Sequence, residues 1–190
     1  TTTPWTLPSN TALTVGIKIN YALIKTYNLY THKAINVIVA NDLIEKVFKS
    51  NFIEVKSEKE LTFDSIKNIP YFICENFTGK DILEVKYNQL WDDAPLPENN
   101  PQNAFRIISG DFVTTDEGTG IVHTAPTFGA DDSFAAKNAS PEVPPMLVYN
   151  ELKELVPLVD LQGKFLNTLK GIGGKYVKNE YYESGFEPDK

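Results

Sequence analysis

Two segments of the chain gather side chains suited to hydrolysis or to binding a small ligand. Residues 1–10 (TTTPWTLPSN) open with three consecutive threonines, followed by a turn that is stiffened by prolines. Three neighbouring hydroxyls supply hydrogen-bond donors and acceptors that can surround a water molecule or a sugar hydroxyl. The alternative is an ordinary polar loop or a frayed terminus, and composition alone leaves both interpretations open.

The second segment, residues 118–132, combines glycines, one histidine and a pair of aspartates. Its three glycines permit close backbone approach and positive φ values. A predicted strand delivers His123, and the turn after it returns Asp131 and Asp132 at the start of a helix. One imidazole and one carboxylate can then surround a small cationic ligand. A structural histidine and a helix-capping aspartate are the alternative interpretation.

Short strands dominate the elements that must position these segments. Alternating or continuous apolar runs predict strands over residues 13–19, 34–40, 71–74, 82–87, 105–109, 120–124, 146–149 and 155–159. Helices are predicted over 41–49, with Asn41 as the N-cap, and over 130–137. Residues 1–10 and 92–102 are typical of loops, and 171–174 of a glycine-rich turn. This pattern favours an α+β fold centred on a closed or nearly closed β-barrel with a few peripheral helices.

Composition narrows the class of protein. The 190 residues are 42% hydrophobic, which suffices for a sizeable core. The net charge of −7 argues against a general nucleic-acid binder, although lysines gather late in the chain at Lys164, Lys170, Lys175 and Lys178. That cluster is consistent with a solvated face or with a local phosphate site.

The sequence gives little support for a membrane span, a disulfide bond or a metal site. We expect no membrane span, because no apolar run approaches the roughly 20 residues that one needs, and we expect no secretory signal. The single cysteine, Cys74, lies in an apolar run and is expected to be a small buried hydrophobe in a reducing compartment. His32, His123 and Cys74 lie far apart, so no metal-ligand spacing is present.

Together the two segments resemble the editing domain (connective peptide 1) of isoleucyl-tRNA synthetases. Residues 1–10 resemble the threonine-rich motif of that family. Residues 118–132 resemble its second motif, in which glycine-threonine-glycine is followed by valine-histidine, alanine-proline and a terminal pair of aspartates. The sister valyl and leucyl domains carry arginine-proline after the first two threonines and lysine or methionine in place of histidine. The Thr3-Pro4-Trp5 and Val122-His123 pairings therefore indicate the isoleucine branch.

The resemblance covers nearly the whole chain, with one departure. Residues 79–83 and the Lys86-Tyr87 pair are also similar to the family, and residues 155–160 and 174–178 resemble its eukaryote-like branch. Thr127 and Phe128 stand where many bacterial members carry glycine and histidine. This chain therefore lacks the second imidazole of those members.

The resemblance implies a function and a set of roles. It implies that residues 1–190 form a single editing domain, excised from a larger class I synthetase, which hydrolyses the ester of misacylated valyl-tRNA(Ile). Asp132 matches the aspartate that binds the substrate ammonium group. Thr2 and Thr3 would hold the attacking water and the ribose hydroxyls, which makes them the other catalytic candidates. His123 would line the side-chain pocket and block isoleucine.

The remaining site, cofactor and partner expectations follow from the same resemblance. Thr1 joins the substrate site, Trp5 packs beneath the first motif, Asn10 holds its backbone or the ligand, and Asp131 lies at the helix start. No metal or cofactor is implied in this domain, whereas the parent enzyme uses ATP and Mg²⁺. The implied partners are the 3′ end of tRNA(Ile) carrying valine and the remainder of the parent synthetase. We expect a cytoplasmic monomer with no membrane association.

Two other functions stay open at this point. Thr1 is suited to act as a terminal nucleophile whose own amine is the base, although the start of the chain has the look of a cut at a domain edge. A module that binds the tRNA end or a protein without catalysis is the second. The pairing of His123 with Asp132 favours recognition of a small aminoacyl group over either one.

Overall fold

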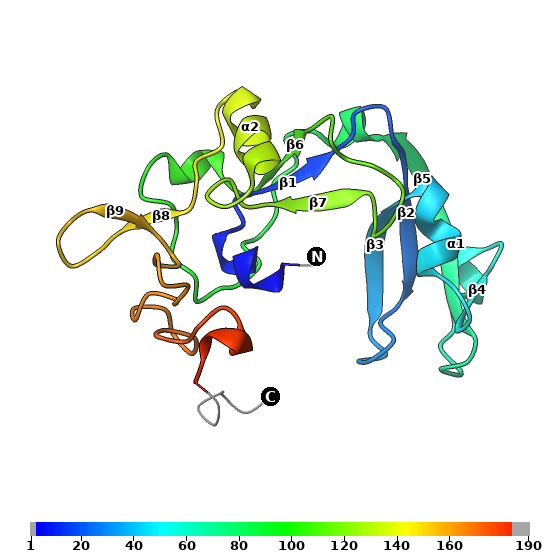
Figure 1. The fold of residues 1–190 in the computed structure, drawn as a ribbon. Coiled ribbons are helices and arrows are strands. Elements are labelled where there is room, and N and C mark those ends of the chain that lie inside the picture. The colour runs from blue at the N-terminus through cyan, green and yellow to red at the C-terminus, as the bar shows by residue number, and fades with distance from the viewer. Residues whose placement is uncertain (1–2, 184–190) are drawn as a thin grey trace. The chain divides into compact units, whose positions relative to one another are not determined.

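The computed structural model describes residues 3–183 (Figure 1). These residues divide into two compact units. Unit 1 takes in residues 3–13, 85–108 and 123–183, and unit 2 takes in residues 14–84 and 109–122. Strands outnumber helices and pair into mixed sheets, so the predicted α+β class is confirmed. The expectation that residues 1–190 form one editing domain stays a prediction.

A four-stranded sheet organises unit 2. Its order is β3-β2-β5-β4, from β2 (Asn20–Tyr27), β3 (Ala34–Ala40), β4 (Phe52–Glu54) and β5 (Ile69–Thr78). β2 pairs antiparallel with both β3 and β5, whereas β4 pairs parallel with β5. Along β2 the side chains of Ala22, Ile24 and Thr26 are buried and those between them are less so. That two-residue period places one face of the sheet on a core.

A three-stranded sheet carries the second of the two segments. Its order is β6-β1-β7, from β1 (Ala12–Val15), β6 (Arg106–Ser109) and β7 (Ile121–Thr124), with β1 in the centre (Figure 1). His123 lies on β7 and is half-buried. The strands predicted at 105–109 and 120–124 are therefore confirmed.

Unit 1 adds a helix and a hairpin around an apolar core. Its helix is α2 (Ala130–Asn138), and β8 (Leu147–Tyr149) pairs antiparallel with β9 (Leu155–Pro157). Short 3-10 helices occur at η1 (Pro4–Ser9), η5 (Pro101–Asn103) and η6 (Asn179–Tyr181). A cluster of buried side chains anchors the unit: Met146, Val148, Leu158, Val159, Phe165 and Leu169.

The helical parts of unit 2 are short. They are η2 (Asn41–Leu43), α1 (Ile44–Val47), η3 (Glu58–Glu60) and η4 (Gly79–Ile82). The helix predicted over 41–49 therefore ends early, because Phe48 leaves the helical region and stacks on Tyr71. Asn41 does not cap it, since its side-chain amide donates to the Asn76 side chain instead.

Two predicted strands are wrong in extent. The strand predicted over 13–19 ends at Val15, because a turn follows in which the Ile19 amide bonds to the Gly16 carbonyl, and β2 begins after it at Asn20. Residues 82–87 are mostly not a strand, because η4 occupies their start and Glu84 has a positive φ of 65°. Only Lys86 forms a bridge, to Arg106. Within residues 3–183, the helices are all too short or too polar to cross a bilayer.

Candidate functional site

Most of the first segment forms a short 3-10 helix, η1 (Pro4–Ser9), where a loop was predicted. Pro4 occupies its first position, where the fixed φ of proline favours a helix start and its missing N–H costs nothing. The Thr6 amide and the Thr6 hydroxyl both donate to the carbonyl of Thr3, at 3.1 and 2.8 Å. Thr3 itself is exposed. A 3-10 helix has three residues per turn, so Thr3 and Thr6 lie one above the other.

Thr6 connects this helix to the histidine of the second segment. The Thr6 hydroxyl lies 3.4 Å from Nε2 of His123, with a donor that depends on the imidazole tautomer. Thr6 is 5% exposed and His123 is half-buried. This contact is one of those that join the two segments that the sequence singled out, which lie more than a hundred residues apart.

Asn10 is a structural connector. Its side-chain amide donates to the carbonyls of Ala12 at 2.7 Å and Thr124 at 3.3 Å, and its side-chain oxygen accepts from the hydroxyl of Tyr87. Asn10 is 2% exposed, and burial raises the pKa of the Tyr87 phenol, so that phenol stays a neutral donor. Asn10 thus holds the end of the first segment against β7, which fits the expectation that it supports the backbone.

Replacing Asn10 with alanine is expected to lower the free energy of unfolding by about 1–3 kcal/mol, because the Tyr87 hydroxyl and the Thr124 carbonyl would be left buried without this partner. Urea unfolding measures the change. Asn138→Ala is the matched control: it removes an exposed amide and should shift stability by no more than about 0.5 kcal/mol. Equal effects from the two substitutions would contradict the connecting role of Asn10.

Asp132 closes the turn between β7 and α2. Its Oδ2 accepts the Ala125 amide at 2.9 Å, across a turn in which the amides of Phe128 and Gly129 bond to the Ala125 carbonyl. A Cβ on Gly129 would lie 2.8 Å from the Asp132 carboxylate, so glycine is needed for this approach, although its φ is −95° and not positive. A carboxylate has several acceptor sites, so one bond to Ala125 leaves capacity for a ligand.

The aspartate pair divides into two environments. Asp132 is half-buried in the first turn of α2, whereas Asp131 is exposed. Asp132 is also near enough to His123 to act on it electrostatically. Of the two aspartates, it is Asp132 whose charge acts on the histidine. Asp131 matches the expected helix-start position.

The electrostatic setting favours a neutral His123. Burial lowers the pKa of its imidazole below the ordinary 6.5, and the nearby Asp132 carboxylate opposes that shift only in part. The unfolded chain therefore takes up the proton at higher pH than the folded one. The contribution of His123 to stability is complete above pH 6.5 and is lost as the pH falls through the folded pKa.

An NMR titration of the His123 ring is expected to give a midpoint below 6.5. The chain has only two histidines, so recording the titration in a His32→Ala background leaves a single imidazole signal. Asp132→Asn should lower the midpoint further, because it removes the charge that favours the imidazolium ion. A midpoint at or above 6.5 in the His32→Ala protein would contradict the buried, neutral setting.

Trp5 packs against the second segment and the core of unit 1. Its ring meets Phe128 edge to face, with centroids 4.9 Å apart, and both rings pack on the cluster around Met146. Phe128, at the position of the missing imidazole, is therefore a packing residue. The neighbouring Thr127 hydroxyl lies 3.3 Å from the Met146 carbonyl.

An apolar hollow of about 460 Å³ lies on one side of η1. Both tryptophans of the chain line it, and neither His123 nor Asp132 does. Such walls suit an apolar group and offer little to a charged ammonium. Its lining residues are Pro4, Trp5, Leu7, Pro8, Leu90, Trp91, Phe165 and Ile172.

The predicted site residues thus divide into three groups. Thr3, Trp5, His123 and Asp132 belong to one neighbourhood in unit 1, which Asn10 supports from within. Asp131 is exposed at the start of α2. Thr1 and Thr2 lie outside the described residues. Sequence analysis gave no role to Thr6 or Tyr87. The three-residue spacing between Thr3 and Thr6 is a local pattern from which the Thr6 contact could have been predicted. Tyr87 contacts Asn10, which is 77 residues away in sequence, so no local pattern indicates its role.

Metal binding finds no support in residues 3–183, where no three His, Cys, Asp or Glu side chains are grouped to hold an ion. Cys74 is half-buried on β5, with its Sγ 3.7 Å from the Phe72 carbonyl. It lies in unit 2, whereas the residues of the candidate site lie in unit 1. The candidate site consists of hydroxyls, one imidazole and one carboxylate.

Curated relatives of the chain carry a common name. The chain is 42% identical over 198 residues to the isoleucine--tRNA ligase of Bacteroides fragilis (strain YCH46), a match that covers 95% of this chain and 17% of the relative. It is 43% identical over 186 residues to that of Cytophaga hutchinsonii, covering 95% of this chain and 16% of the relative. The cytoplasmic enzyme of Saccharomyces cerevisiae is 35% identical over 180 residues, covering 94% and 14%. The chain therefore spans only 14–17% of the length of these relatives.

The other two comparisons add less. A crystal structure described as GlLeuRS-CP1 matches 73% of this chain and 42% of its own, with a TM-score of 0.45 and 19% sequence identity. No protein-family model matches the chain.

Proposed function

Because this chain belongs to the isoleucine--tRNA ligase family over nearly all of its length, we propose that it is the part of such an enzyme that hydrolyses misacylated valyl-tRNA(Ile). The reaction is post-transfer editing: water cleaves the ester that joins valine to the terminal ribose of the tRNA. The partners of the reaction are the 3′ end of tRNA(Ile) and the remainder of the parent synthetase. Water is its only co-reactant, and the domain acts as a monomer.

One observation carries this proposal. The threonine-rich segment and the histidine–aspartate segment converge in unit 1, through the 3.4 Å contact between Thr6 and His123 and the ring contact between Trp5 and Phe128. An unrelated polar loop and a structural histidine have no reason to meet in this way. The convergence instead supports a site in which a carboxylate, an imidazole and several hydroxyls of the protein surround a small ligand.

The Asp132 carboxylate is suited to bind the ammonium group of the substrate. An aminoacyl ester carries a free, charged amine, and a carboxylate forms a charge-assisted hydrogen bond with it. Asp132 is half-buried, which strengthens such a bond over one in open water. Its bond to the Ala125 amide fixes the orientation of the carboxylate before the substrate arrives. Asp132 is therefore the anchor for the amine.

The hydroxyls explain the hydrolytic step. The water oxygen attacks the ester carbonyl carbon, the bond from that carbon to the ribose oxygen breaks, and the ribose oxygen takes a proton to give free tRNA and valine. We assign Thr2 and Thr3 to hold the water and the ribose, with Thr6 fixing the turn through the Thr3 carbonyl. Catalysis then rests on positioning, aided by the vicinal hydroxyl of the substrate, because an ester is already a reactive target.

The histidine explains selectivity. A hydrophobic pocket gains only about 1–3 kcal/mol from one methylene, and the choice of this enzyme family between isoleucine and valine is itself the reference case for that range. A second site that excludes the larger side chain is therefore needed. A neutral, half-buried imidazole is suited to that task, because it occupies space without repelling the substrate ammonium. His123 thus forms the wall of the second site, the wall that excludes the isoleucine side chain.

The experiment is a single-turnover hydrolysis assay with excess protein, on valyl-tRNA(Ile) and isoleucyl-tRNA(Ile). We expect valine to be released much faster than spontaneous hydrolysis allows, and isoleucine to be spared. Unchanged lifetimes for both esters together with tight binding would support a binding module instead. Adding residues before Thr1 should leave the rate intact, whereas a terminal threonine nucleophile would lose all activity.

A further inference from the structure

A stretch near the end of unit 1 has a charge opposite to that of the whole chain. Residues 161–178 contain four lysines and no aspartate or glutamate, although the net charge of the chain is −7. Lys170 is paired with Asp93 at 2.9 Å, so its charge is already compensated. Among the described residues no ion pair is seen for Lys164, Lys175 and Lys178, and the latter two are exposed.

Tyrosines lie among these lysines. The ammonium of Lys164 lies 4.6 Å from the centre of the Tyr176 ring, and the two residues form an antiparallel bridge. Tyr176 meets Tyr181 and Tyr182 edge to face, with centroids 6.0 and 4.9 Å apart. The Tyr176 amide also donates to the Tyr182 hydroxyl at 2.8 Å. Tyr181 is 48% exposed and so presents its ring to a ligand.

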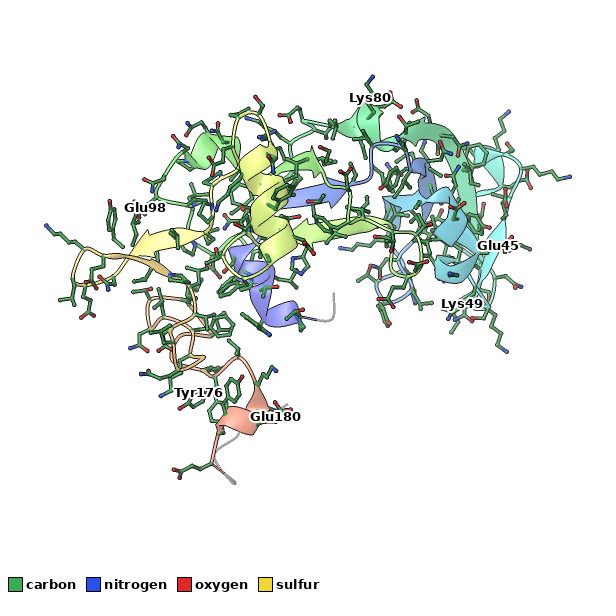
Figure 2. All side chains as sticks on the ribbon, turned by 45° about the horizontal axis from the view of Figure 1, so that its top comes forward. Glu45, Lys49, Lys80, Glu98, Tyr176 and Glu180 are labelled. Atoms are coloured by element: carbon green, nitrogen blue, oxygen red, sulfur yellow. The ribbon has the colours of Figure 1, made fainter. Side chains whose placement is uncertain are left out.

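The stretch is held in place although it has little regular structure. Phe165 and Leu169 are buried in the core of unit 1, and the amides of Phe165 and Val177 bond to the carbonyls of Lys175 and Gly163. Figure 2 shows Tyr176 and Glu180 together in this part of the chain. Glu180 and Asp160 are the nearest acids in sequence, and Asp160 accepts the Gln162 and Lys164 amides. The backbone that carries the lysines and tyrosines is therefore held by the core of unit 1.

We propose that this lysine–tyrosine surface, formed by Lys164, Lys175, Tyr176, Lys178 and Tyr181, binds single-stranded nucleic acid. Lysines neutralise backbone phosphates, and exposed rings stack on unpaired bases whatever their sequence. The inference rests on the proposed function, under which the unpaired 3′ end of a tRNA must reach a site in the same unit. It adds the surface that receives the strand just before that end.

The test measures binding of a fluorescent 12-nucleotide single-stranded RNA to this chain by anisotropy, over a series of salt concentrations. Each phosphate contact on a single strand contributes about 0.7 to the slope of log affinity against log salt. Lys175→Ala/Lys178→Ala should therefore reduce the slope by about 1.4 and weaken binding roughly 25-fold at about 0.1 M salt. The matched control, Lys33→Ala/Lys67→Ala, removes the same charge from exposed sites in unit 2 and should leave both values nearly unchanged.

The aromatic part has its own variants. Tyr181→Ala should weaken binding at least about fivefold without changing the salt slope, and Tyr181→Phe should restore it, because stacking needs the ring and not the hydroxyl. Three results would overturn the proposed RNA-binding role of this surface. They are no RNA binding by the unaltered chain, a loss of binding in the Lys33→Ala/Lys67→Ala control equal to that in the test variant, or lysine-dependent binding of a polyglutamate peptide as strong as that of the RNA. Lysine-dependent binding with no hydrolysis of valyl-tRNA would instead overturn the proposed function alone.

Discussion

Replacing Asp132 with alanine is expected to lower the single-turnover rate of valyl-tRNA(Ile) hydrolysis at least about 30-fold. The substitution removes the carboxylate that anchors the substrate ammonium, and losing one partner of a buried charge-assisted pair costs about 2–5 kcal/mol. Asp132 also closes the turn through the Ala125 amide, so alanine removes two interactions at once. The rate measured on valyl-tRNA(Ile) gives the combined effect.

Asparagine at the same position separates those two roles. Asp132→Asn keeps an oxygen that can accept the Ala125 amide and removes only the charge. If the charge anchors the amine, the asparagine variant should be nearly as slow as the alanine variant while its stability to urea stays close to that of the unaltered chain. A fast asparagine variant would show that Asp132 serves the turn alone. Asp131→Ala, at the exposed neighbour, should leave the rate within about twofold, as expected for a surface substitution.

Replacing His123 with alanine is expected to relax selectivity. The smaller side chain opens the wall of the pocket, so isoleucyl-tRNA(Ile) should be hydrolysed and the ratio of valine to isoleucine rates should fall about tenfold or more. That magnitude follows from the roughly 1–3 kcal/mol that one methylene contributes to discrimination. The paired rates on the two esters measure this ratio directly, and the valine rate should change less than the isoleucine rate.

The second histidine provides the control for this variant. His32 stacks on Phe63 in unit 2, so His32→Ala removes an imidazole without touching the candidate site. Its ratio of rates should match that of the unaltered chain. If His123→Ala instead loses activity on both esters in equal measure, His123 acts on the reaction itself and not on the choice of side chain.

The sequence was informative where signals are local. The α+β class, β3, β7 and α2 could be predicted from strand and helix periods within a few residues. The two aspartates at positions 131–132 also indicate the start of α2. The predictions were wrong where a local pattern continues in the sequence but a turn or a tertiary contact ends the element earlier. Ile17 and Ile19 continue the alternation of β1, yet both lie in the turn from Gly16 to Ile19 that ends the strand. Likewise the helix after Asn41 is cut short by ring packing of Phe48 on β5.

The candidate site shows the same division. Residue types and order singled out His123 and Asp132, and the structure brings them near one another across the turn at Gly129. The meeting of Thr6 with His123 and of Tyr87 with Asn10 depends on how distant segments pack, which no local period records. The different exposure of Asp131 and Asp132 likewise follows from the phase of α2 relative to the turn.

A crystal structure of the chain with a valyl-adenosine analogue, in which an amide replaces the ester, tests the central claim most directly. We predict electron density between η1 and the first turn of α2, with the ammonium group at hydrogen-bonding distance from Asp132 and the valine side chain against His123. Density confined to the apolar hollow beside Trp91, or to unit 2, with no contact to Asp132, would contradict the proposed editing site.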